Sequence, residues 1–240
     1  GIRPDAPVTI EAHEAGVKIL PEIEVAADLT EVPIIAITGS NGKSTVTSMV
    51  GAILEQAGLD APVCGNLGTA LSEVVRAELN GGISPDAYVV EVSSFQAHSI
   101  RDFHPRVAVI LNIQPDHLDW HGTLDAYAKA KLRLVRNMDA TNWLIYNSDD
   151  PKLTSYLPQH NVRLLPFMSE PSNPEAPAAW VGNGKVCWWT TGLEATGMNV
   201  EELRVIGQHN HTNACVAAAV ASLLNVAPES IRAALSTYEG

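Results

Sequence analysis

The sequence of 240 residues has few cysteines, more negative than positive charge and no long apolar run. Cys64, Cys187 and Cys215 are widely separated and form no C-x-x-C pair, which argues against a disulfide framework or a zinc site and favours a reducing, cytoplasmic compartment. The net charge of −12 disfavours nucleic acid as a partner, because phosphate backbones are bound through Lys and Arg. No apolar run reaches the roughly 18 residues of a membrane span, so no membrane partner is expected.

Apolar runs rich in β-branched residues alternate with helical patterns from residue 33 to about residue 165. The expected strands are Ile34–Ile37, Ala61–Cys64, Ala87–Val92, Val107–Asn112, Trp143–Tyr146 and Val162–Leu165. The expected helices are Ser44–Ala57, Ala70–Leu79, Leu124–Asn137, His209–Leu224 and Pro228–Tyr238. This alternation is typical of an α/β fold of three layers, in which a mostly parallel sheet carries helices on both faces. Ligands of such sheets bind at the carboxyl ends of the strands.

Two regions depart from this alternation. Three prolines predict a loop, at Pro171, Pro174 and Pro177. Two short strands flanking Asn183-Gly184 then predict a β-hairpin, and hence a small antiparallel β appendage. At the start of the chain, the pattern predicts a helix near Val8–Ala15, a stop at Gly16 and a strand at Val17–Leu20.

The stretch "TGSNGKST", residues 38 to 45, joins an expected strand to an expected helix. Gly39 and Gly42 allow a tight turn whose backbone N–H groups can approach an anion. Lys43 can reach the β- and γ-phosphates of a nucleotide, and the Ser44 hydroxyl can coordinate Mg²⁺. The common pattern G-x-x-x-x-G-K-[ST] would require glycine at the position of Ile37, so this P-loop type of loop is shorter than usual. The alternative is a glycine-containing turn with an incidental lysine.

Glu91 ends the apolar strand in "AYVVEVSSFQ". An acidic residue beside a phosphate-loop strand is suited to help bind Mg²⁺, although it could instead cap the following turn. Ser93, Ser94 and Gln96 follow it, and they could hydrogen-bond a substrate or only cap that turn.

The stretch "VAVILNIQPDHLDWHG" repeats this arrangement of a strand followed by polar residues. A histidine that lies between carboxylates at the end of a strand can bind a metal through its ring nitrogen. On this basis His117, between Asp116 and Asp119, is favoured as functional over structural, and His121 is not favoured.

Lys131 lies on the half-buried stripe of the expected helix Leu124–Asn137. It could extend along the surface with its amine in water, or it could point into the site. Further along, Asn210 and Asn213 are one helical turn apart, so both amides can face one ligand such as adenine or a ribose hydroxyl. The alternative role for Asn210 is that of a helix N-cap.

Taken together and in this order, four motifs resemble the ATP-binding central domain of the Mur ligases. They are "TGSNGKST", "EVSSFQ", "NIQPDHLD" with "AYAKAKLRL", and "GQHNHTNA". These ligases are cytoplasmic enzymes that form the amide bonds of the peptidoglycan peptide. The resemblance covers essentially the whole chain, and the short phosphate loop is the form that this family uses. Within the family, "SSFQ" and "GQHN" are most similar to the members that add D-glutamate.

The resemblance implies an acyl-phosphate mechanism with ATP and Mg²⁺, in which UDP-N-acetylmuramoyl-L-alanine is joined to D-glutamate. It implies that the phosphate loop binds ATP through Gly39, Ser40, Asn41, Gly42, Lys43, Ser44 and Thr45. Lys43 would hold the transferring phosphate, while Ser44 and Glu91 would serve one Mg²⁺. His117 would serve a second Mg²⁺ together with Lys131, which matches a lysine that is carbamylated in the family.

The remaining implied roles concern binding. The side of the site that binds the UDP substrate would be lined by Asn66, Ser93 and Gln96, and the nucleoside would contact Asn210 and Asn213. Residues 1–30 would be the remnant of a UDP-binding domain with its linker, and residues 31–240 the ATP-binding domain. The domain that binds the amino acid is expected to be absent, so we expect little ligation from this chain alone.

Two alternatives remain. Another Mur-type ligase or a folylpolyglutamate synthase would share the phosphate loop but accept a different substrate. A nucleotide-binding switch module would need no catalytic residues, but the sequence contains no N-K-x-D motif for guanine.

Overall fold

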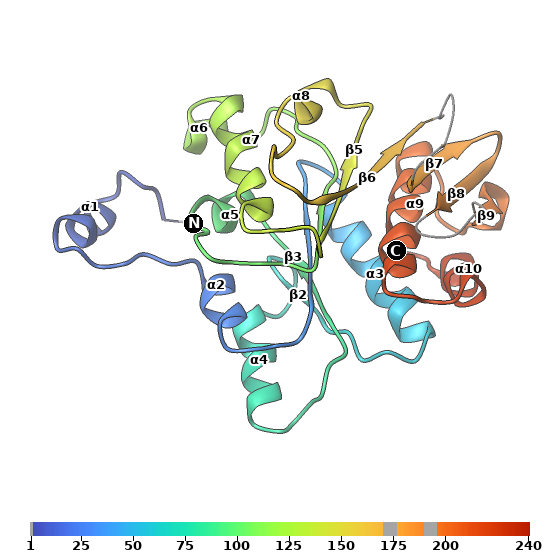
Figure 1. Ribbon diagram of the computed structural model, residues 1–240, viewed down its shortest axis with the longest axis horizontal. Coiled ribbons are helices and arrows are strands. Elements are labelled where there is room, and N and C mark those ends of the chain that lie inside the picture. Colours follow the sequence, from blue (N-terminus) through green and yellow to red (C-terminus); the bar gives the residue numbers. More distant parts are fainter. Residues whose placement is uncertain (1, 170–176, 190–195) are drawn as a thin grey trace.

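The computed structural model describes residues 2–169, 177–189 and 196–240. Within these residues the strands form one nine-stranded sheet in the order β2-β3-β1-β4-β5-β6-β7-β8-β9 (Figure 1). The strands are β1 (Ile34–Thr38), β2 (Val63–Gly65), β3 (Tyr88–Glu91), β4 (Val107–Ile110), β5 (Trp143–Asn147), β6 (Arg163–Met168), β7 (Ala178–Gly182), β8 (Lys185–Trp189) and β9 (Thr196–Asn199). Neighbours from β2 to β7 pair in parallel, and β8 pairs antiparallel with β7 and β9.

Strand β1 lies at the centre of the parallel part of the sheet, between β3 and β4. All five of its residues are buried, as its apolar β-branched sequence predicts. Its register pairs Ile37 with Glu91 on one side and with Val109 on the other. The chain segments that follow these three strands therefore meet at one edge of the sheet.

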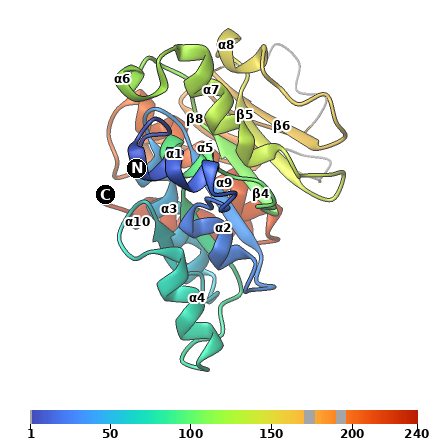
Figure 2. The same cartoon turned by 90° about the vertical axis from the view of Figure 1, so that its left-hand side faces the viewer.

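Helices cover both faces of the sheet, which confirms the predicted three-layer α/β fold (Figures 1 and 2). One face packs against α3 (Lys43–Gln56), α9 (Gln208–Leu223) and α10 (Pro228–Thr237). The other packs against α2 (Glu22–Ala27), α4 (Leu71–Leu79), α5 (Ser94–His98) and α7 (Leu124–Leu132). Short helices complete the chain at α6 (Leu118–His121) and α8 (Pro151–Thr154), with 3₁₀ turns at Arg133–Val135 and Val200–Glu202. No helix in the described ranges is long and apolar enough to cross a bilayer.

The hairpin predicted around Asn183-Gly184 is present as β7 and β8. It is continuous with the main sheet, because β7 pairs in parallel with β6. Trp188 of β8 is 2% exposed and belongs to the core. Pro171 and Pro174, where a loop is expected, lie outside the described residues.

The N-terminal segment, residues 2–20, differs from its prediction. Helix α1 (Pro7–Glu14) is present, has no buried residue and projects from the body of the molecule (Figure 1). The strand expected at Val17–Leu20 is wrong: these residues are irregular and Val17 is 58% exposed. Helix α2, which buries Ile23 and Ala26 in the core, was not predicted from the sequence.

Candidate active site

The phosphate loop, residues 39–45, joins the end of β1 to the start of α3. Gly42 precedes α3 with φ of 86°, a conformation that favours glycine. A Cβ atom at this position would lie 2.9 Å from Oδ1 of Asn213, so the loop and the start of α9 approach too closely for a side chain. Ser44 and Thr45 then begin the first turn of α3, where backbone N–H groups are free to bind an anion.

Lys43 lies over the loop that precedes it. Its Nζ donates hydrogen bonds to the carbonyl oxygens of Gly39 and Ser40, both at 3.0 Å. The ammonium charge is therefore held at the same edge of the sheet as the helix N-terminus. This arrangement suits the binding of a polyphosphate.

The loop is tied to the segment that follows β4. The backbone N–H of Asn41 donates to Oδ1 of Asn112 at 2.9 Å, and its side-chain amide donates to Oε1 of Gln114 at 2.8 Å. The hydroxyl of Ser40 donates to the Gln114 carbonyl at 3.0 Å. These bonds fix the loop from a second strand.

Glu91 is 2% exposed, and both of its oxygens accept hydrogen bonds. The Ser44 hydroxyl donates to one oxygen at 2.6 Å, and the Asn66 amide donates to the other at 2.7 Å. One carboxylate beside one hydroxyl is a donor set that fits Mg²⁺, which commonly takes its other ligands from phosphates and water. The described residues contain no group of three or more His, Cys, Asp and Glu side chains that could hold a metal by themselves.

Lys131 is 1% exposed, so its amine does not extend into water. Its Nζ donates to the Gly39 carbonyl at 2.8 Å and lies 4.6 Å from the centre of the Tyr127 ring. Burial, and secondly the charge of Lys43, lower the pKa of Lys131 to about 7. Of the two alternatives for this residue, the structure therefore shows the one in which it points into the site.

His117 precedes α6 in a left-handed conformation, with φ of 50°. Its ring lies against Phe95, with 4.8 Å between the ring centres, and its Nε2 is 3.4 Å from a carboxylate oxygen of Asp116. The side chain is about half exposed, so the ring can reach a ligand from solvent. Its role as a metal ligand stays a prediction.

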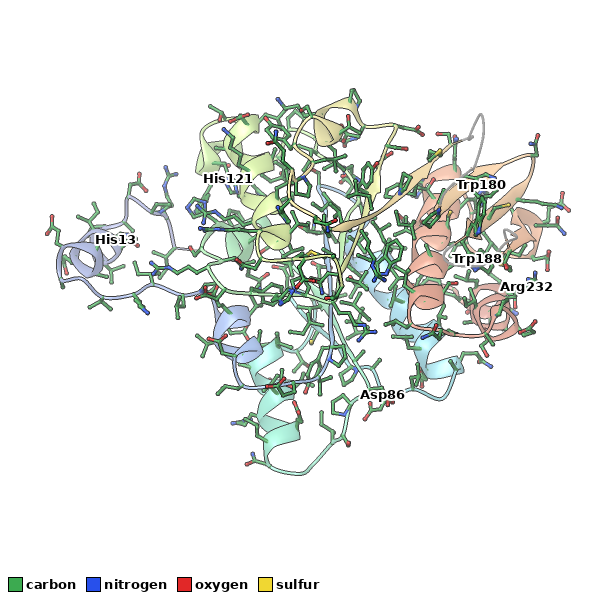
Figure 3. The ribbon with its side chains drawn as sticks, viewed as in Figure 1. His13, Asp86, His121, Trp180, Trp188 and Arg232 are labelled. Atoms are coloured by element: carbon green, nitrogen blue, oxygen red, sulfur yellow. The ribbon has the colours of Figure 1, made fainter. Side chains whose placement is uncertain are left out.

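His121, at the other end of α6, is more enclosed than His117. Figure 3 labels its side chain on α6. Its Nε2 is 3.0 Å from the Ser94 hydroxyl, and its ring lies against those of Phe95, Trp120 and Tyr127. Burial first, and then nearby positive groups, lower the pKa of His121 to about 4. The ring is therefore neutral near pH 7.

A cavity of about 660 Å³ lies between the N-terminal segment and α5. Its lining includes the three residues predicted to face the UDP substrate, Asn66, Ser93 and Gln96. Ser93 and Gln96 also form a capping box at the start of α5, with the Gln96 backbone N–H 3.3 Å from the Ser93 hydroxyl. The structure therefore shows the capping role of this pair, and its contact with a substrate stays a prediction.

Asn210 and Asn213 lie in the first two turns of α9, and Asn213 lies beside the phosphate loop. The Asn213 amide donates to Oδ1 of Asn210 at 3.4 Å, and the Asn210 amide donates to the Ile206 carbonyl at 2.9 Å. The N-cap of α9 is Gly207, so the alternative that Asn210 is the N-cap is wrong.

The sequence reasoning missed Tyr127, Asn112 and Gln114. The Tyr127 hydroxyl lies 3.0 Å from that of Ser40, so it supports the phosphate loop. Its position four residues before Lys131 on one helix was an available signal, because such residues share a face. Asn112 and Gln114 belong to the stretch "NIQPDHLD", in which only the carboxylates and the histidine were considered as site residues.

A parallel sheet with a lysine-containing phosphate loop at its carboxyl edge defines a nucleotide-binding α/β protein. Residues 37–221 match the family model described as the Mur ligase middle domain, and the chain therefore belongs to the Mur ligase family. Mur ligases are ATP-dependent ligases.

Curated relatives include two proteins named UDP-N-acetylmuramoylalanine–D-glutamate ligase. The one from Christiangramia forsetii is 35% identical over 243 residues, an alignment that covers all of this chain and 53% of that protein. The one from Streptococcus thermophilus is 36% identical and is covered to 51%. This chain thus spans about half the length of the curated relatives it matches.

Solved structures share the fold at lower identity. The UDP-N-acetylmuramate:L-alanyl-gamma-D-glutamyl-meso-diaminopimelate ligase of Neisseria meningitides is 19% identical with a TM-score of 0.69, covering all of this chain and 76% of that one. The MurF ligase of Thermotoga maritima, in complex with ADP, is 18% identical with a TM-score of 0.62, covering 90% of this chain and 50% of that one.

Proposed function

We propose that this chain is the ATP-binding core of a cytoplasmic ligase that joins D-glutamate to UDP-N-acetylmuramoyl-L-alanine during peptidoglycan synthesis. One observation carries the proposal: Glu91 accepts a hydrogen bond from Ser44 of the phosphate loop and another from Asn66 of the cavity wall. A nucleotide on the loop and a substrate in the cavity would meet at this carboxylate. The names of the curated relatives supply the choice of substrate and amino acid.

The reaction has two steps. A carboxylate oxygen of UDP-N-acetylmuramoyl-L-alanine attacks the γ-phosphorus of ATP, and the bond to ADP breaks to leave an acyl phosphate. The amine of D-glutamate then attacks the acyl carbon, loses a proton and displaces phosphate. Lys43 offsets the negative charge that develops on the transferring group. Mg²⁺ at Ser44 and Glu91 would neutralise phosphate charge when bound.

Lys131 is proposed to be carbamylated and to help hold a second Mg²⁺ with His117. Its lowered pKa supports this role, because only a neutral amine adds CO₂. The modification replaces a cation by an anion, which favours a metal ion. On the other side of the loop, Asn210 and Asn213 are proposed to contact the nucleoside, which the closeness of Asn213 to Gly42 supports.

The first experiment is titration of Mg²⁺–ATP into the 240-residue chain by calorimetry. We expect saturable binding, a preference for ATP over GTP, and a loss of about tenfold to a hundredfold in affinity for Lys43→Ala, since the variant lacks a charged partner for phosphate. Lys185→Ala, at an exposed lysine of β8, is the control. Equal binding by wild type and a folded Lys43→Ala protein would contradict the proposal, and a preference for GTP would favour a switch module.

The acceptor needs a second experiment on the natural protein that carries these 240 residues. Purified protein is given Mg²⁺–ATP, UDP-N-acetylmuramoyl-L-alanine and D-glutamate, L-lysine or meso-diaminopimelate in parallel. A folate with L-glutamate tests the alternative of a folylpolyglutamate synthase. We expect amide product with D-glutamate alone; product with another pair would reassign the substrate while keeping the ATP site.

A further inference from the structure

Helix α6 directly follows His117, and its own sequence does little to stabilise it. It spans four residues, Leu118–His121, and none of them is buried. The residue before it, the N-cap His117, adopts a left-handed conformation that non-glycine residues rarely occupy. A single helical turn of this kind is not stable by itself, so side-chain contacts must hold it in place.

Within α6, Trp120 and His121 make ring contacts with α5, and His117 just before the helix also lies against Phe95 at 4.8 Å. His121 makes the hydrogen bond to Ser94, the first residue of α5, and its ring is stacked on Phe95 at 13° between the planes. The Trp120 ring lies edge-on to Phe95, 5.1 Å away. These contacts hold α6 against α5.

The same histidine also contacts the support of the phosphate loop. Its ring centre is 5.2 Å from that of Tyr127, and the Tyr127 hydroxyl is 3.0 Å from the hydroxyl of Ser40. The Lys131 amine lies over the same Tyr127 ring, 4.6 Å from its centre. His121 therefore contacts α5, α7 and, through one intermediate, the loop itself.

We propose that His121 is a positioning residue: its hydrogen bond to Ser94 locks α6 onto α5 and thereby fixes His117 for its ligand. The inference rests on the proposed function only for the role of His117. A ring that served only to fill space could be replaced by phenylalanine, so the hydrogen bond distinguishes the two roles.

The test compares His121→Phe, which keeps a flat ring, with Ser94→Ala, which removes the partner of the same bond, and with the double variant. His160→Phe is the matched control, because it removes a histidine hydrogen bond of equal length, to the Val135 carbonyl. The first readout is millisecond hydrogen exchange without metal or nucleotide. It follows the amides of Trp120 and His121, which donate to the carbonyl of His117, and the amide of Gly122, which donates to that of Leu118.

We expect exchange at these amides to rise about three- to tenfold in both single variants, the size that loss of one hydrogen bond predicts. The double variant should show no further rise, because both changes remove one bond. The second readout is the Mn²⁺ dissociation constant with ATP present. It should rise about three- to tenfold in His121→Phe and in Ser94→Ala, and stay unchanged in His160→Phe.

The outcomes separate this inference from the proposed function. If His117→Ala weakens Mn²⁺ binding but His121→Phe matches wild type in both readouts, the positioning role is wrong and the proposed function stands. A lower melting temperature with unchanged exchange and Mn²⁺ affinity would also refute positioning. If wild type binds no Mn²⁺–ATP, or His117→Ala has no effect, the proposed metal role of His117 fails and the inference fails with it.

Discussion

The phosphate loop and the N-terminal segment both border the candidate site, but they are held in different ways. The loop lies between buried residues, Thr38 and Val46, and hydrogen bonds join it to α7 and to the segment that follows β4. The N-terminal segment exposes much of its apolar surface, with Val8 at 59% and Val17 at 58%. The core and these hydrogen bonds therefore fix the conformation of the loop. The N-terminal segment instead forms one wall of a cavity and contributes little to the core.

This comparison predicts that changes near the loop affect the stability of the whole protein, and that changes in the segment do not. The predictions below run from the largest expected effect to the smallest.

Lys131 should make stability depend on pH. Its pKa is about 7 when folded, against an ordinary value of 10.5, so between these values the unfolded chain binds a proton that the folded chain does not. The contribution of Lys131 to the free energy of unfolding therefore rises with pH by about 1.4 kcal/mol per unit, or about 4 kcal/mol from pH 7 to pH 10. Urea unfolding of wild type and Lys131→Met in CO₂-free buffer measures it. Parallel pH profiles for the two proteins would show that Lys131 is not responsible.

Gly65→Ala should lower the free energy of unfolding by about 3 kcal/mol or more. Gly65 has φ of 103°, and a Cβ there would lie 2.4 Å from the Glu91 carbonyl oxygen. Gly68→Ala is the matched control, because Gly68 has φ of 66° and nothing within 4 Å of an added Cβ. Denaturant unfolding should show a much smaller loss there, of about 1 kcal/mol. Equal losses would mean that backbone conformation, and not the contact with Glu91, limits this position.

Ile23→Ala and Ile10→Ala compare the two N-terminal helices directly. Ile23 of α2 is fully buried, so its truncation should cost about 3 kcal/mol of unfolding free energy. Ile10 of α1 is 45% exposed and should cost about 0.5 kcal/mol or less. Thermal unfolding measures both changes. A large loss of unfolding free energy in Ile10→Ala would contradict the conclusion that the N-terminal segment contributes little to the core.

Tyr127→Phe should have a smaller effect than the changes at Lys131, Gly65 and Ile23. The variant keeps the ring between His121 and Lys131 but removes the hydroxyl beside Ser40. We expect a loss of about 1 kcal/mol in unfolding free energy, the usual worth of one hydrogen bond. Tyr238→Phe, after α10 on the other face of the sheet, is the control and should change nothing measurable. An unchanged Tyr127→Phe protein would show that Gln114 holds the Ser40 hydroxyl without a contribution from Tyr127.

The parts of the fold that could be predicted are those whose signal is local and long. The central strands were found because β-branched apolar runs mark buried parallel strands, and α3 because its apolar residues recur at helical spacing. Helices α2, α5 and α6 span four to six residues each, which is too short for a periodic pattern. The prediction of a strand at Val17–Leu20 was wrong because an apolar run forms a strand only where it can hydrogen-bond to the edge of a sheet.

The candidate site divides in the same way. Lys43, Ser44 and Glu91 stand next to strand ends and were found from adjacent residues. Tyr127 supports Ser40 from 87 positions away, and Gln114 supports Asn41 from 73 positions away. No single-sequence pattern reports a contact across such a separation.

The sequence by itself determined the parallel α/β sheet, the glycine-rich phosphate loop and the polar residues at the strand ends, because each depends on residues within one strand, turn or helix. Only the tertiary structure decided that Lys131 is buried with a lowered pKa, that Glu91 joins the loop to Asn66, and that His121 contacts both α5 and α7. These properties depend on desolvation and on contacts between distant segments, which exist only once the chain has packed.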